Sequence, residues 1–160
     1  MRKLYNETGG ARGAFVVATN ASWGLDNGQP ADAPLWCAFY DSLGTVGILN
    51  CGATANNNVN IDQVGDLPTA CPSEYMIAVT ATNSDDIRTF SGYGVEHIDV
   101  GAPGQAIVSI NLNGGPTTTS GTSFASPLVA GMIGLMYSAP CPYLGSMAKS
   151  SPATATQLVR

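Results

Sequence analysis

The segment of residues 122–137 restricts the fold of this chain more than any other part of its sequence. It is small and apolar, it carries no charged side chain, and Ala125, Ala130, Gly131 and Gly134 lie within it. A helix on the surface of a protein has a polar face toward water, which this segment lacks. The segment therefore predicts a helix that is buried and closely packed in the centre of the molecule.

The rest of the chain alternates apolar runs with turn-rich loops, which is typical of an α/β protein. A strand, a helix and a second strand are predicted in succession near the N-terminus, and such a unit builds a parallel sheet. The strand candidates are residues 14–18, 46–49, 75–80 and 107–110, and the further helix candidates are residues 34–43 and a segment that starts at Ser151. The sequence thus predicts a parallel sheet that packs against a central helix starting near Ser123.

With 160 residues the chain has the length of one domain, and its charged fraction of 11% indicates burial rather than disorder. Its net charge is −5 and its basic residues form no run, so we expect no nucleic acid and no anionic lipid as a partner. No window reaches the roughly 20 consecutive apolar residues of a membrane-spanning helix, and the first residues lack the apolar core of a signal peptide. We therefore expect no membrane as a partner.

Four cysteines, Cys37, Cys51, Cys71 and Cys141, are spaced widely along the chain. Zinc sites and thioredoxin-like sites use pairs of cysteines separated by two residues, and no such pair is present. We therefore expect no metal ligand among the site residues. The sequence leaves two alternatives open for the cysteines, namely buried free thiols or disulfides in one of three pairings.

Ser123 is predicted at the first turn of the uncharged helix, a position that suits a nucleophile. A serine hydroxyl attacks a carbonyl only when a base takes its proton and donors stabilise the resulting oxyanion. The first N–H groups of a helix have no acceptor within the helix and so can donate to that oxyanion. Gly121 would let a substrate backbone approach closely, and Pro127 is tolerable if it lies near the first turn. The alternative is a structural helix with a capping serine.

Residues 121–131 read Gly-Thr-Ser-Phe-Ala-Ser-Pro-Leu-Val-Ala-Gly and resemble the nucleophile signature of the subtilisin-like serine peptidases. The family pattern is Gly-Thr-Ser-x-Ala-x-Pro-x-Val-Ala-Gly, and Leu128 stands where the family usually has a histidine that is not part of the catalytic triad. The resemblance covers residues from about Ala14 to Arg160 and implies the three-layer fold of this family. It also implies a serine endopeptidase that hydrolyses peptide bonds through an acyl-enzyme at Ser123.

Two upstream blocks extend the resemblance. Residues 98–104, Ile-Asp-Val-Gly-Ala-Pro-Gly, are similar to a structural block of the family, which assigns Asp99 to the scaffold rather than to catalysis. Residues 53–56 are similar to the Ala-Ala-Gly-Asn block, which places Asn56 on the asparagine that binds the oxyanion. An amide N–H suits that role because it donates without titrating. Ala55 replaces the usual glycine, and the run of three asparagines leaves a different register or a plain turn as alternatives.

The resemblance also implies a set of substrate-binding residues. These are Ser22, Trp23, Gly24, Ala53, Ala55 and Gly121. The first three follow a predicted strand and resemble the segment that pairs with the substrate backbone and begins one wall of the pocket for the residue before the scissile bond. The two alanines correspond to the opposite wall. Trp23 is interpreted either as a substrate contact or as a core residue.

In this family the catalytic aspartate and histidine precede all the blocks present here, and the chain has neither an Asp-Ser-Gly or Asp-Thr-Gly strand end nor a His-Gly-Thr helix start. The one histidine, His97, lies beside the structural block and is expected to be structural. The resemblance therefore implies that residues 1–160 are the C-terminal segment of one catalytic domain, incomplete at the N-terminus and also at the C-terminus. Such a chain is expected to be inactive by itself, to be marginally stable or to self-associate, and to need the N-terminal half of the domain as its partner.

Two hypotheses about function follow from this resemblance. The first is the serine endopeptidase, which would act on polypeptide substrates outside the cell and need no cofactor for its chemistry. The second is a catalytically inactive fragment or relict that acts as a peptide-binding or scaffold module. Structural calcium is familiar in the parent enzymes, and in this chain Asn60, Asp62 and Asp66 offer oxygen ligands, although without the spacing of an Asp-x-Asp-x-Asp-Gly loop.

Overall fold

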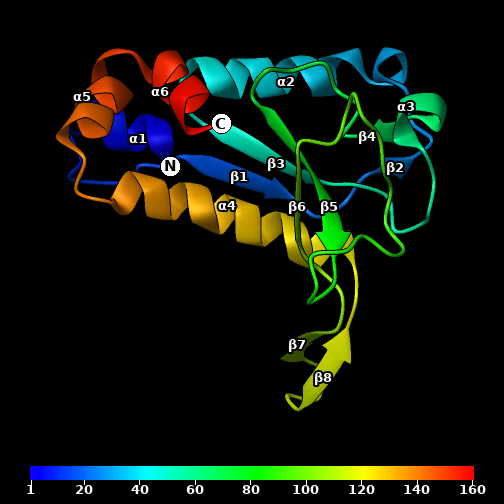
Figure 1. Cartoon of the computed structure of the whole chain (residues 1–160). Coiled ribbons are helices and arrows are strands. Elements are labelled where there is room, and N and C mark those ends of the chain that lie inside the picture. Colours follow the sequence, from blue (N-terminus) through cyan, green and yellow to red (C-terminus); the bar gives the residue numbers. More distant parts are fainter.

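A parallel sheet of four strands forms the middle layer of the fold (Figure 1). Its strands are β1 (Ala18–Ala21), β3 (Leu49–Ala53), β5 (Met76–Thr82) and β6 (Val100–Pro103), which lie in the order β1-β3-β5-β6. All neighbouring pairs are parallel, so the carboxyl ends of all four strands meet at one edge. The computed structural model describes all residues from 1 to 160.

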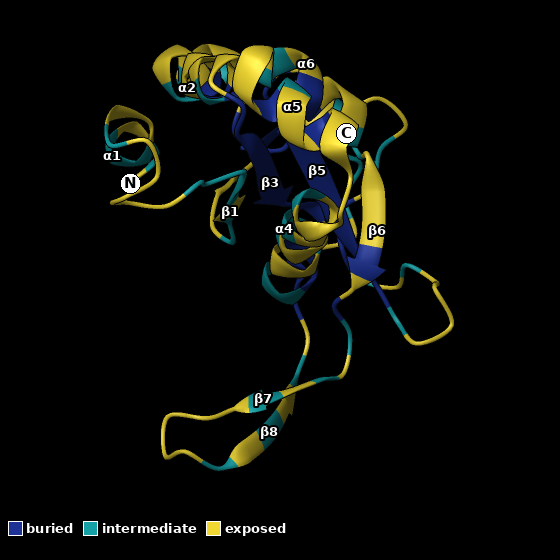
Figure 2. Ribbon diagram, turned by 90° about the vertical axis from the view of Figure 1, so that its left-hand side faces the viewer, coloured by how far each residue is buried: buried dark blue, intermediate teal, exposed yellow.

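Helices cover both faces of this sheet and complete three layers (Figure 1). The helix α4 (Thr122–Ser138) lies on one face, and the helices α2 (Pro34–Thr45), α5 (Pro142–Ser150) and α6 (Pro152–Val159) lie on the other side in both views (Figures 1 and 2). The remaining elements are short: α1 (Arg2–Glu7), β2 (Leu25–Asp26), a 3-10 turn (Pro30–Asp32), α3 (Ile61–Val64), β4 (Asp66–Leu67), β7 (Ile107–Ile110) and β8 (Pro116–Thr119). The predicted α/β fold with a parallel sheet is confirmed.

The main core lies between the sheet and α4. Alternate residues of β3 and β5 point toward α4, because side chains alternate between the two faces of a strand. The buried residues of this cluster are Leu49, Cys51, Ile77, Val79, Ala81, Ala102, Ala125 and Ile133. Every residue of β3 and β5 is buried, which explains why β5 was recognisable as a continuous apolar run, whereas β3 contains Asn50 and Gly52 and was not.

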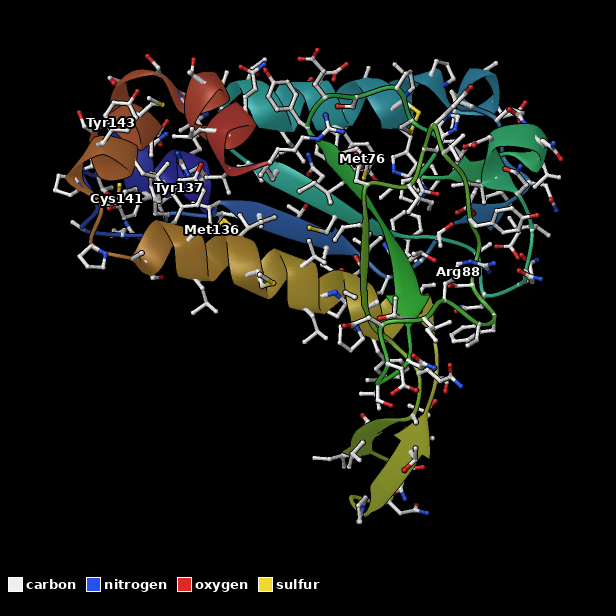
Figure 3. All side chains as sticks on the ribbon, viewed as in Figure 1. Met76, Arg88, Met136, Tyr137, Cys141 and Tyr143 are labelled. Atoms are coloured by element: carbon white, nitrogen blue, oxygen red, sulfur yellow. A yellow bond between two sulfur atoms is a disulfide. The ribbon has the colours of Figure 1, made fainter.

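A second core lies on the α2 side and contains a disulfide between Cys37 and Cys71. The other buried members of this cluster are Tyr40, Leu67 and Met76, and Figure 3 shows Met76 on the sheet below α2. Cys51 is free and buried in the main core, whereas Cys141 is free and exposed at the turn between α4 and α5 (Figure 3). Each of the two alternatives thus holds for some of the cysteines, since one pair is oxidised and Cys51 is a buried thiol, whereas the exposed thiol of Cys141 fits neither.

Two strand predictions began too early along the chain. The strands start at Ala18 and Leu49 rather than at residues 14 and 46. Val46 is the residue that ends α2, and Gly47 then turns the chain with a φ of 85°, a conformation that glycine adopts readily. Hydrophobicity alone does not distinguish such a connecting turn from the strand that follows it.

Two further differences concern the last strands. Residues 107–110 form a strand as predicted, but this strand, β7, pairs with β8 in a hairpin that projects away from the sheet (Figure 1). The fourth strand of the sheet is β6, which comes from the block that was predicted only as structural. The sequence Val-Gly-Ala-Pro of β6 has one β-branched residue, so its strand character comes from pairing with β5 rather than from propensity.

The helix α4 begins at Thr122 as predicted, but it is buried on one side only. Its sheet side holds Ala125 and Ile133, whereas Leu128, Met132 and Leu135 are 47%, 57% and 71% exposed. Figure 2 accordingly shows much of α4 as exposed. The prediction of complete burial is therefore wrong for this chain, because the sheet covers one face of the helix and nothing in the chain covers the other.

No single helix of the chain is long and apolar enough to cross a membrane; α4 and α5 would satisfy both criteria only when taken together, and the chain bends by 105° between them.

The disulfide closes a long loop, since its two cysteines are 34 positions apart in the sequence, and this loop contains the whole of β3. We expect the double variant Cys37→Ser/Cys71→Ser to lose about 2 to 4 kcal/mol of unfolding free energy, because the reduced chain has more freedom when unfolded. Urea denaturation followed by circular dichroism would measure this loss. Cys141→Ser, which removes an exposed free thiol, is the matched control, and equal midpoints for the double variant and the control would contradict the prediction.

Candidate active site

A cavity of about 230 Å³ opens at the carboxyl edge of the sheet, between the ends of β1 and β3 and the start of α4. This edge is where open parallel sheets place their ligands. Its lining residues are Ser22, Trp23, Gly24, Asp26, Ala53, Thr54, Ala55, Asn56, Asn57, Asp66, Thr122 and Ser123. The structure therefore brings together seven of the eight predicted site residues, and Gly121, the eighth, directly precedes α4.

Ser123 is the second residue of α4 and is partly exposed to solvent. Its backbone N–H has no acceptor in the chain, as expected for the first turn of a helix. Its hydroxyl has no hydrogen-bond partner and faces the cavity. The serine thus presents a hydroxyl and an unpaired N–H at the positive end of a helix dipole, where a developing negative charge is stabilised.

Asn56 is held next to Ser123 by hydrogen bonds from Thr122. The N–H of Thr122 donates to Asn56 Oδ1 at 2.8 Å, and the hydroxyl oxygen of Thr122 lies 3.1 Å from the same atom. Because Oδ1 is engaged as an acceptor, the amide nitrogen of Asn56 is left as a free donor. This orientation is the one that an oxyanion-binding asparagine needs.

Gly121 keeps the space between these two residues open. A Cβ atom at position 121 would lie 3.2 Å from Ser123 Oγ and 3.5 Å from Asn56 Oδ1. Any side chain would therefore extend from that point into the region where a substrate carbonyl would meet the serine. The N–H of Gly121 donates to the carbonyl of Gly104 at 2.8 Å, so the structural block of residues 98–104 fixes the approach to α4.

A chain of polar contacts ties the end of β1 to α4. Pro127 has no N–H and cannot donate to the carbonyl of Ser123 four residues earlier, and the hydroxyl of Ser22 supplies that donor at 2.9 Å. The amide of Asn20 donates to Ser22 Oγ at 2.9 Å, and the hydroxyl of Ser126 donates to Asn20 Oδ1 at 2.6 Å. Pro127 therefore lies beyond the first turn, and a residue of the cavity wall compensates for its missing N–H.

Trp23 belongs to the cavity wall and not to the core, since it is 65% exposed. Its ring stacks on that of Trp36, with 4.8 Å between ring centroids and 14° between planes. Gly24, the next residue, packs against the carbonyl of Leu67 so closely that a side chain at position 24 would overlap that oxygen. The wall from Ser22 to Gly24 is thus fixed by stacking on one side and by close backbone packing on the other.

Comparison with known proteins agrees with this geometry. The model of the subtilase family matches residues 11–158. The chain belongs to the subtilase family. A Subtilisin-like protease 6 from Trichophyton verrucosum is 35% identical over 129 residues, which cover 81% of this chain and 30% of that protein. The Subtilisin-like serine protease AsES of Sarocladium strictum is 34% identical over 128 residues, which cover 74% of this chain and 31% of that protein.

A solved structure extends this similarity to three dimensions. The crystal structure of a cold-adapted subtilisin-like serine proteinase superposes with a TM-score of 0.65 at 31% sequence identity, covering 88% of this chain and 46% of that one. This subtilase chain therefore spans about a third of the length of the curated relatives it matches, and about half of that solved structure. The predicted subtilisin-like fold is confirmed.

Two carboxylates at one end of the cavity were missed as site residues of this subtilase. Asp66 lies in β4 and Asp26 in β2, and the two residues are direct cross-strand partners. Burial raises the pKa of the Asp66 carboxyl, hydrogen bonds from Thr69, Thr54 and the N–H of Ala55 act in the opposite direction, and the charge of Asp26 raises the pKa further. Asp66 had been named only as a potential calcium ligand. No sequence signal marks two-residue strands, so their pairing was not predictable.

The three residues suggested for calcium point to different places in this subtilase. Asp66 faces the cavity, whereas the carboxylate of Asp62 accepts hydrogen bonds from the N–H groups of Val95 and His97 and contacts the His97 ring at 2.8 Å. Burial makes the largest single contribution to the pKa of Asp62 and raises it, but the hydrogen bonds together outweigh burial and lower that pKa below its ordinary value. Asn60 accepts from the N–H of Asp62, and no three His, Cys, Asp or Glu side chains gather around one point.

His97 and Asp99 both take part in scaffold contacts. The ring of His97 joins its loop to Asp62, and His97 is not among the residues that line the cavity. Asp99 accepts the N–H of Ala78 at 2.8 Å and pairs with Arg160 at 2.8 Å. Neither side chain is placed to act on Ser123.

The hydrogen bond from Ser22 to the carbonyl of Ser123, which replaces the missing N–H of Pro127, can be tested by mutation. We expect Ser22→Ala to lower the unfolding free energy by about 1 kcal/mol, because the carbonyl of Ser123 loses the only donor that the chain offers it. Thermal denaturation would measure the change. Ser42→Ala is the matched control, since Ser42 donates to the carbonyl of Ala38 on the exposed side of α2, where the backbone N–H groups are intact. Equal losses in the two variants would contradict the prediction.

The raised pKa of Asp66 makes the stability of the fold depend on pH. The folded chain binds a proton at Asp66 more tightly than the unfolded chain does, so protonation favours the folded state. This stabilisation is present below the pKa of the unfolded chain and is lost as the pH rises through the raised pKa of the folded state. Asp66→Asn stays neutral, and we expect its unfolding free energy to increase relative to the parent chain as the pH rises from about 3 through the raised pKa of Asp66.

Urea denaturation at several pH values would measure this difference. Asp85→Asn, in an exposed loop, is the matched control for removal of one carboxylate. A difference between Asp66→Asn and the parent chain that shrinks as the pH rises would show that the assigned direction is wrong.

Proposed function

We propose that this chain supplies the nucleophile and the oxyanion-binding groups of a subtilisin-like serine endopeptidase. The observation that carries the proposal is the pairing of an unpartnered Ser123 hydroxyl with two free donors, the Ser123 N–H and the amide nitrogen of Asn56, around one cavity. The hydroxyl oxygen attacks the scissile carbonyl, and the two donors stabilise the oxyanion. The resulting acyl-enzyme at Ser123 is then hydrolysed by water.

The serine proton must pass to a base that this chain does not provide. No histidine lines the cavity, and His97 is engaged by Asp62. We propose that the base and its orienting carboxylate come from the N-terminal half of the same catalytic domain, and that residues 1–160 are catalytically inactive without it. The small fraction of the curated relatives that the chain spans supports this proposal.

Two surfaces support the assignment of an N-terminal half as the partner. The strand β1 lies at the edge of the sheet, with β3 on one side and no neighbour on the other. The helix α4 exposes Leu128, Met132 and Leu135 on the side away from the sheet. An unpaired edge and an apolar face together are the surfaces that a missing layer of the same domain would cover.

The proposed substrate is a polypeptide in extended form. The segment from Ser22 to Gly24 continues from β1 along the cavity, where its backbone can pair with a substrate strand. No cofactor is needed for the chemistry of serine acylation. Structural calcium belongs to the parent protein in this proposal. We also propose that the enzyme acts outside the cell, a location that the family relationship supports.

The competing proposal is an inactive fragment or relict that binds peptides or serves as a scaffold. A fluorophosphonate, which reacts with activated serines, separates the two. We expect labelling of Ser123 in the parent protein, or in this chain after addition of the N-terminal half, and no labelling of the chain alone or of Ser123→Ala. Absence of labelling in the parent protein would exclude the endopeptidase and favour the binding module.

The oxyanion role is tested in the same active preparation. We expect Asn56→Ala to lower kcat by about 10² to 10³-fold, the loss known for such a donor in a subtilisin, with little change in KM. Asn57→Ala is the matched control, because Asn57 lines the same cavity without contacting Thr122. A larger loss in Asn57→Ala would move the oxyanion role to that neighbour.

A further inference from the structure

The acidic end of the cavity is not explained by the fold. Asp26 and Asp66 face each other across the β2–β4 pair, and like charges in that position destabilise a pair of strands. Neither carboxylate has a basic partner, since the three ion pairs of the chain join Lys3 with Glu7, His97 with Asp62 and Arg160 with Asp99. No lysine, arginine or histidine lines the cavity. The two charges are therefore left without compensation.

Only one of the two carboxylate oxygens of Asp66 accepts hydrogen bonds from the protein. The exposed fraction of Asp66 is 2%, and its recorded hydrogen bonds come from Thr54, Thr69 and the N–H of Ala55, all to the single atom Oδ2. Oδ1 has no donor in the protein, although Asp66 lines the cavity. This oxygen is not among the buried atoms of the chain that lack a partner, so it is open to the cavity and can accept a hydrogen bond from a donor that occupies it.

The same contacts connect this end of the cavity to the catalytic end. Thr54 and Ala55, which hold Oδ2 of Asp66, directly precede Asn56. Most residues of the lining are polar, and its three apolar side chains are those of Trp23, Ala53 and Ala55. A largely polar cavity that has these three side chains and a negative end matches a side chain with an aliphatic stem and a positive tip.

We infer that this cavity selects lysine or arginine as the residue whose carbonyl Ser123 attacks, with Asp66 and Asp26 binding its positive tip. The inference rests on the proposed function for the placement of the scissile bond. Asp66 Oδ1 accepts a hydrogen bond from the ammonium or guanidinium group. Asp26, an exposed residue of β2 opposite Asp66, adds a second negative charge. Cation binding also relieves the repulsion between the two carboxylates.

A binding experiment on this chain tests the cavity without the triad. The probe is p-aminobenzamidine, an aryl amidinium whose fluorescence reports its transfer from water to an apolar site. We expect Asp66→Asn to raise its Kd by about thirtyfold or more, because the variant removes one partner of a buried charge pair. Asp26→Asn should raise the Kd by about threefold, since this charge is exposed and screened.

The control variant Asp85→Asn removes a carboxylate from an exposed loop and should leave the Kd unchanged. Circular dichroism establishes that Asp66→Asn is folded; if it is not, the effect of Asp26→Asn on the Kd decides the matter, because no hydrogen bond of the fold depends on that side chain. No binding of the probe, or equal Kd values for the parent chain and the two cavity variants, would overturn the inference.

A cleavage experiment on the complete enzyme then separates the two proposals. Matched peptides carrying arginine, lysine, leucine or phenylalanine before the scissile bond are compared by kcat/KM, with fluorophosphonate labelling of Ser123 as the measure of activity. We expect the basic peptides to be preferred and Asp66→Asn to abolish the preference. Labelling with a preference for phenylalanine or leucine would overturn this inference alone. Amidinium binding that depends on Asp66, without labelling of Ser123, would overturn the proposed function alone.

Discussion

The hydrogen bonds of Thr122 are the contacts on which the arrangement of the site depends. Its hydroxyl donates to the carbonyl of Thr54 at the end of β3, and its N–H donates to Oδ1 of Asn56. These bonds hold the first residue of α4 against the sheet and leave the amide nitrogen of Asn56 free. Because Thr122 is buried, loss of its side chain would leave the carbonyl of Thr54 without that donor. The position of Ser123 thus depends on Thr122, a residue that takes no part in the proposed reaction.

Several polar groups that the fold leaves without partners gather around this one cavity. They are the hydroxyl and N–H of Ser123, the amide nitrogen of Asn56, and Oδ1 of Asp66. The chain also leaves Arg2 Nε, Thr82 Oγ1 and the hydroxyl of Tyr137 without partners, but these three atoms are buried and their residues do not line the cavity. The groups at the cavity differ in that a bound ligand can reach them and supply the missing partners.

The sequence predicted those parts of the site that depend on local pattern. The start of α4 and the positions of Ser123 and Asn56 followed from short motifs, and the buried strands followed from apolar runs. Asp26 and Asp66 were beyond such reasoning, because they meet through two-residue strands that are far apart along the chain. The disulfide was also undetermined, since Cys37 and Cys71 come together only through the packing of α2 on the sheet. Long-range packing, rather than weak local signals, therefore set the limit of prediction.

The two faces of α4 connect assembly of the domain to its chemistry. One face is packed on the sheet through Ala125 and Ile133, and this contact fixes the direction in which the Ser123 end of the helix points. The other face exposes Leu128, Met132 and Leu135, and burial of these side chains would contribute a favourable free energy to the binding of another layer. A partner that buries this face comes to lie along the same helix that carries the nucleophile. If the partner also supplies the base, as in the proposed function, the apolar contact that completes the core would also complete the catalytic site, and a half-assembled domain would expose Ser123 without activating it.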